Sequence, residues 1–148
     1  MSVSKYESKV CSIPCDAHTV YSVLSRLDSL ERVRDLIPQD KVRELEIMPD
    51  CIRMKVDGLG QKICIRIVDR KEDDTIKFGI ENIPMDMNFW IQLKQVAPCD
   101  TRVRLTLHAD MPMMFRMMLG SKIQKGLDDG AQMLTQFPYE LWSRSSEV

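Results

Sequence analysis

Apolar and polar residues alternate along most of the chain between residues 41 and 110. A period of two predicts β-strands that bury one face and expose the other to water. We expect strands at residues 5–13, 42–48, 52–56, 62–67, 76–81, 87–94 and 102–109. Turn signals stand between them at residues 49–50, 57–60, 71–74 and 98–100, so consecutive strands should pair in antiparallel fashion.

Two short helices are predicted directly after the first strand. The first covers about residues 17–27, where apolar residues recur at helical spacing and Asp16 stands at the N-cap position. The second covers residues 29–37, and Pro38 ends it because the residue before a proline disfavours helical backbone.

One long helix is predicted near the C-terminal end, from about residue 113 to residue 136. Asp110 is placed to cap it, Pro112 stands in its first turn and Pro138 stops it. Its expected buried stripe comprises Met113, Met117, Gly120, Ile123, Leu127, Ala131 and Leu134. At about 1.5 Å per residue, such a helix is roughly 36 Å long.

These elements predict an α+β fold that forms a single domain over residues 1–148. The economical arrangement is a curved antiparallel sheet of about seven strands that wraps its apolar face around the long helix. The pattern leaves open whether the tail at residues 138–148, which includes Leu141 and Trp142, is flexible or docks on the domain or on a partner.

The composition indicates a globular protein and weighs against a dedicated nucleic-acid binder. The chain has 148 residues, of which 44% are hydrophobic and 29% charged, so it can build a core without disulfides or metal ions. Its 21 Lys and Arg residues against 22 Asp and Glu residues give a net charge of -1, which weighs against a dedicated nucleic-acid binder.

The cysteines and the apolar segments predict a cytoplasmic location. Five cysteines, an odd number, are spread along the chain within and beside the predicted strands and are expected to be reduced thiols. The first residues lack the apolar stretch of a signal peptide, and no stretch reaches the roughly 18 apolar residues that a membrane span requires.

The order of elements resembles a known superfamily. The opening segment YESKVCSIPCDAHTVYSVLSRLDSLERV, the strand meander and the closing segment KIQKGLDDGAQMLTQFPYEL together resemble the helix-grip fold called START-like or SRPBCC. That superfamily includes lipid-transfer domains, the birch pollen allergen and polyketide cyclases. The resemblance covers nearly the whole chain, and it implies a cavity between the sheet and the long helix that often holds an apolar ligand.

The inward positions of the predicted strands are all apolar, so we expect them either to line such a cavity or to pack as a solid core. The methionine-rich segment at residues 111–119 is predicted to fill the core, to line the cavity mouth or to cover a partner subunit in a homodimer. The candidate ligand-binding residues are Met54, Ile65, Phe78, Met87, Phe89, Ile91, Leu105, Leu107, Met113, Met114, Met117 and Met118.

No motif for catalysis, metal binding or a cofactor is found. The two histidines, His18 and His108, stand in different elements, and Cys11 and Cys15 have no second pair at zinc spacing. The favoured function is therefore non-catalytic binding or transport of a lipid, a sterol or a polyketide-like molecule. A cyclase or dehydratase would need a polar group inside the cavity, and a protein-interaction module would need no cavity.

A second possible interaction surface is the outer face of the sheet. Its predicted basic residues are Arg53, Lys55, Lys62, Arg66, Lys77, Lys94, Arg102 and Arg104, with Trp90 among them. These residues could form a patch for RNA, an anionic membrane or an acidic protein. The near-neutral net charge favours an ordinary solvated face instead.

Overall fold

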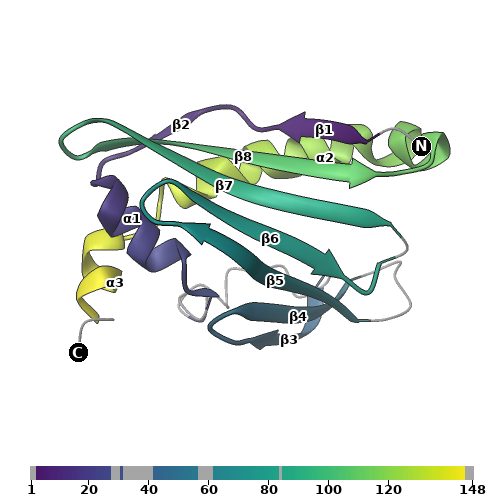
Figure 1. Cartoon of the computed structure of the whole chain (residues 1–148), viewed down its shortest axis with the longest axis horizontal. Coiled ribbons are helices and arrows are strands. Elements are labelled where there is room, and N and C mark those ends of the chain that lie inside the picture. Colours follow the sequence, from purple (N-terminus) through teal and green to yellow (C-terminus); the bar gives the residue numbers. More distant parts are fainter. Residues whose placement is uncertain (1–2, 28–30, 32–41, 57–61, 84, 146–148) are drawn as a thin grey trace.

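An antiparallel sheet backed by one long helix makes up most of the computed structural model, which describes residues 3–27, 31, 42–56, 62–83 and 85–145 (Figure 1). Two short helices lie together at one end of the molecule. The elements are β1 (Ser4–Glu7), β2 (Cys11–Ile13), α1 (Ala17–Leu24), β3 (Val42–Ile47), β4 (Cys51–Val56), β5 (Lys62–Lys71), β6 (Thr75–Glu81), β7 (Asp86–Ala97), β8 (Asp100–Asp110), α2 (Met113–Leu134) and α3 (Tyr139–Ser145).

The sheet is antiparallel throughout, in the order β1-β8-β7-β6-β5-β4-β3, and β2 also pairs with β8. Strand alternation places one set of apolar residues inward: on β8, Val103, Leu105, Leu107 and Ala109 are buried. In Figure 1, α2 runs behind β8, and it contacts β8, β1 and β2. The predicted α+β architecture, a sheet packed against a long C-terminal helix, is confirmed.

The first predicted strand is divided into β1 and β2 by an irregularity at residues 8–10. Glu7 pairs with Thr106 and Cys11 pairs with Val103, so three residues here oppose two on β8, which is the geometry of a β-bulge. Ser8 holds the bulge: its N–H donates to the Leu105 carbonyl at 2.8 Å, and its Oγ accepts from the Leu105 N–H at 2.9 Å.

The starts of the two larger helices differ from the prediction. Asp16 occupies the N-cap position of α1, but its carboxylate accepts hydrogen bonds from Gln95 Nε2 at 3.0 Å and from the Cys99 N–H at 2.9 Å, so it ties α1 to the β7–β8 turn. The predicted cap at Asp110 is wrong, because this residue ends β8, in register with Asp86, and Pro112 takes the N-cap position of α2.

The tail packs onto the domain as α3. Tyr139 and Trp142 are buried, and α3 contacts α1. The Tyr139 hydroxyl donates to the Leu134 carbonyl, an unpaired group at the end of α2, at 2.5 Å. Burial raises the pKa of this phenol, which keeps it protonated as a donor.

Two predictions lie outside the described residues: the second short helix at residues 29–37 and the turn at residues 57–60. The charged turn at residues 71–74 joins β5 to β6 as expected. Among the described residues, no helix is both long enough and apolar enough to cross a membrane.

Replacing Ser8 by Ala should lower the free energy of unfolding by about 1–3 kcal/mol, because the buried Leu105 N–H loses its acceptor. Urea denaturation measures this loss. Ser12→Ala is the matched control, since Ser12 is exposed on the next strand and should change stability by less than about 0.5 kcal/mol. Equal stability of the Ser8 variant and the wild type would contradict the role of Ser8 in the bulge.

Candidate ligand cavity

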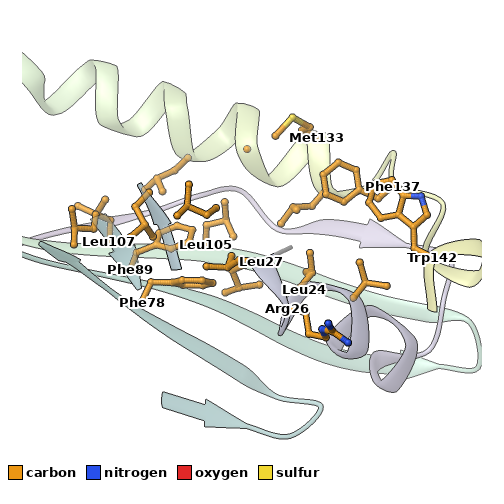
Figure 2. A pocket seen from close by; sticks show the side chains of 18 residues that line it. Leu24, Arg26, Leu27, Phe78, Phe89, Leu105, Leu107, Met133, Phe137 and Trp142 are labelled. Atoms are coloured by element: carbon orange, nitrogen blue, oxygen red, sulfur yellow. The ribbon is translucent and has the colours of Figure 1, made fainter. Parts of the chain in front are cut away.

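A cavity of about 340 Å³ lies between the inner face of the sheet and the helices (Figure 2). This volume is at the lower end of the range of roughly 300–1,000 Å³ that small-molecule sites occupy. Its walls are made by Val23, Leu24, Arg26, Leu27, Ile52, Ile65, Phe78, Ile80, Phe89, Ile91, Leu105, Leu107, Leu127, Gly130, Met133, Leu134, Phe137 and Trp142.

The sheet side of the cavity is a row of apolar pairs on neighbouring strands. Phe78 on β6 stands opposite Phe89 on β7, which in turn stands opposite Leu107 on β8, and Ile91 stands opposite Leu105. The two phenyl rings have their centroids 5.4 Å apart at a tilt of 44°, which is a favourable aromatic arrangement. Because alternate residues of a strand share one face, the same pattern that buries the sheet builds this wall.

The helix side depends on a close approach at Gly130. A Cβ atom added at this position would lie 3.2 Å from Leu105 Cδ1, so the missing side chain lets α2 approach β8. Leu127 and Leu134, each about one turn away from Gly130, cover the space on either side.

Aromatic and aliphatic side chains line the end of the cavity near α1 and α3. Phe137 and Trp142 have ring centroids 5.0 Å apart, and Figure 2 shows both beneath the last turns of α2. Val23, Leu24 and Leu27 reach the cavity from α1 and the residues after it. The sequence analysis did not assign these residues to the site. The apolar helical spacing at residues 17–27 could have found Leu24 and Leu27, whereas no periodic signal marks Phe137 and Trp142.

The described lining offers little for acid–base chemistry. Arg26 is its one charged side chain, and the Trp142 indole N–H is the only other side-chain polar group among the described lining residues. Arg26 is exposed while also lining the cavity, so it lies at an opening, and Figure 2 shows it on the α1 side, away from α2. A molecule in this cavity would therefore contact apolar side chains along the walls and one positively charged side chain, Arg26, at the edge.

The structure brings together half of the predicted ligand-binding residues. Those that line the cavity are Ile65, Phe78, Phe89, Ile91, Leu105 and Leu107. Met54 and Met87 pack against the core but are outside the lining.

The four predicted methionines at the start of α2 are not at the cavity. Met113, Met114, Met117 and Met118 are exposed, and the lining of α2 begins only at Leu127. Of the segment at residues 111–119, Met111 is fully buried in the core as predicted, whereas the prediction that the segment fills the core or lines the cavity mouth is wrong for these four methionines. The reason is that the helix begins beyond the part that the sheet covers, so its apolar stripe starts with Ile123 and Leu127 rather than with Met113.

The remaining chemistry-bearing residues lie outside the cavity. His18 Nδ1 is 3.0 Å from Asp73 Oδ1, and Glu72 is near enough that these three groups could hold a metal ion, although His18 and Glu72 are exposed surface residues. All five cysteines are free. Burial raises the pKa of the Cys15 and Cys64 thiols, which lowers their reactivity.

The outer face of the sheet carries ion pairs. Arg66 pairs with Glu81 at 2.9 Å, and Arg104 pairs with Glu7 at 2.9 Å. Trp90 packs edge-on against His108 at 4.6 Å between centroids, under the Lys77 ammonium. Carboxylates thus offset part of the positive charge that the sequence places on this face.

Comparisons with known proteins identify the fold. No family model and no curated protein matches the sequence. Norcoclaurine synthase from Thalictrum flavum, solved in complex with dopamine and hydroxybenzaldehyde, matches with a TM-score of 0.70 at 11% identity over 99% of this chain and 87% of its own. A Thermobifida fusca protein solved by NMR matches with a TM-score of 0.62 at 14% identity over 95% of this chain and 93% of its own.

A START superfamily protein from Mycobacterium smegmatis also matches, with a TM-score of 0.54 at 14% identity over 90% of this chain and 99% of its own. At these identities the likeness shows the fold. The chain has the helix-grip fold of these proteins.

Enlarging a side chain at the cavity should be tolerated better than enlarging one in the filled core. Ile65 lines the cavity, whereas Ile76 is fully buried outside it. We expect Ile76→Phe to lower the free energy of unfolding by about 1–3 kcal/mol through overpacking, and Ile65→Phe to lower it by less than about 1 kcal/mol. Urea denaturation of both variants tests this, and equal losses would mean that the space beside Ile65 is filled.

Proposed function

We propose that this protein binds a compact apolar small molecule in the cavity between its sheet and α2. The supporting observation is a lining of hydrocarbon side chains with Arg26 as the one charged group among the described lining residues. Ligand pockets combine largely apolar walls with a few polar groups that fix orientation. Residues Ile65, Phe78, Phe89, Ile91, Leu105 and Leu107 would contact the ligand.

The cavity volume favours a small ligand. At about 30 Å³ for each water molecule in the liquid, 340 Å³ corresponds to roughly eleven waters. A ligand with one to three fused rings, or with a single short acyl chain, fits this space better than a lipid with two chains. Its binding energy would come mainly from the apolar surface that it buries, about 25 cal/mol for each Å² before the costs of ordering.

Binding is favoured over catalysis by the chemistry of the walls. Norcoclaurine synthase shows that the fold can support an enzyme. General acid–base catalysis needs a group that exchanges protons near neutral pH, and the described lining contains no carboxylate, histidine, lysine or cysteine. The free state of all five cysteines agrees with a reducing compartment such as the cytoplasm.

Native mass spectrometry of freshly purified protein should show an additional mass that disappears under denaturing conditions. Titration with the fluorescent probe 1-anilinonaphthalene-8-sulfonate gives a second readout, with enhanced emission for the wild type and weaker emission for Ile65→Phe, because the added ring occupies the cavity. A bare mass together with no emission enhancement in the folded protein would contradict the proposal.

Arg26 should distinguish acidic ligands from neutral ones of the same length. We expect Arg26→Gln to weaken the binding of decanoate several-fold and to leave the binding of decanol nearly unchanged, because only the carboxylate gains a charge-assisted hydrogen bond at the rim. Isothermal titration calorimetry measures both affinities. Arg102→Gln, on the exposed outer face, is the control. Equal effects of Arg26→Gln on both ligands would place their polar ends elsewhere.

A further inference from the structure

The beginning of α2 is an exposed apolar surface that the cavity does not explain. We call residues 113–118 the methionine tip. Met113, Met114, Met117 and Met118 are 72%, 71%, 80% and 61% exposed, and Phe115 between them is 39% exposed. Single exposed apolar residues are common on proteins, but contiguous groups of this kind mark interaction sites. Figure 1 shows the tip at the end of the molecule opposite α1 and α3.

The charges around the tip are of one sign. Residues 111–127 contain no Asp or Glu, and they include Arg116, Lys122 and Lys125. Both lysines are exposed. They follow Met118 by four and seven residues, so they lie on the same side of the helix, about 6 Å and 10 Å further along its axis.

The nearest acidic residues stand at the two ends of this basic stretch: Asp110 and its register partner Asp86 come before it, and Asp128 and the exposed Asp129 come after it. Asp128 Oδ1 accepts the Lys9 N–H at 2.7 Å, which fastens the bulge before β2 to the middle of α2. Asp110 has one of its carboxylate oxygens buried. Between these acidic ends, the tip and the two turns after it present methionine side chains followed by two exposed lysines.

We propose that the methionine tip docks on an anionic lipid bilayer, with Met113, Met117 and Met118 entering the interface and Lys122 and Lys125 meeting lipid phosphates. If the tip enters end-on, Met118 lies about 6–10 Å deeper than the two lysines, which is comparable to the depth of about 5–10 Å that apolar side chains of interfacial helices reach at the headgroup boundary. Basic residues beside such a segment are attracted to the negative surface of anionic leaflets.

A second copy of the chain suits the tip less well. In a two-fold symmetric dimer the same patch meets itself, so Arg116, Lys122 and Lys125 of the two copies would gather around one contact. Like charges placed together across an interface disfavour association. An anionic bilayer satisfies both the apolar side chains and the cations, and this proposal does not depend on the ligand cavity.

Vesicle co-sedimentation tests the proposal. We expect the wild type to bind vesicles of phosphatidylcholine with roughly 30% phosphatidylserine, to bind pure phosphatidylcholine at least several-fold more weakly, and to lose binding as salt is added. The double variant Met117→Ser/Met118→Ser and the double variant Lys122→Glu/Lys125→Glu should each reduce binding to the anionic vesicles by about tenfold.

Leu141→Ser is the matched control, because Leu141 is 62% exposed on α3, at the opposite end of the molecule, and does not line the cavity. It should bind anionic vesicles like the wild type. Circular dichroism confirms that each variant is folded, which is expected because the altered side chains are exposed. The proposal is overturned if the wild type binds neither vesicle, if the methionine variant binds as well as the wild type, or if sedimentation shows a dimer that this variant dissociates.

Discussion

A single helix has to cover the apolar face of a sheet that is much wider than the helix. Seven strands about 4.8 Å apart span roughly 29 Å, whereas a helix with its side chains is about 10–12 Å across. α2 packs on the side of β8, β1 and β2. The cavity lies between α2 and the inward apolar residues of β4 to β8, where one helix is too narrow to fill the space over the sheet, and α1 and α3 cover one end of it.

A few neighbouring residues fix the contact between α2 and the sheet. Gly130 has no side chain that would hold α2 away from Leu105. In the neighbouring bulge, Ser8 forms hydrogen bonds to both the N–H and the carbonyl of Leu105. Asp128 then joins the bulge to the helix through the Lys9 N–H. The height of α2 above the sheet, and with it the volume of the cavity, follows from this group of contacts.

Much of the fold could be predicted from the sequence because strand alternation is a local signal. The same alternation identified Phe78, Phe89 and Leu105 as inward residues, and they line the cavity. It could not show where the sheet stops covering the helix, so Met113 and Met117 were assigned to the buried stripe although both are exposed. The burial of Trp142 against Phe137 depends on tertiary packing, for which seven residues of helix carry no periodic signal.

The attachment of α3 has a consequence for the rate at which the cavity can exchange its contents. The strand walls are held by hydrogen bonds to neighbouring strands, and moving them would break several ladders together. α3 is one short helix joined to α2 through residues 135–138, with the Tyr139 hydroxyl bond to Leu134 at the junction. Because packing and a few hydrogen bonds hold α3, rather than a strand ladder, opening this end of the cavity breaks fewer backbone hydrogen bonds than moving a strand wall does.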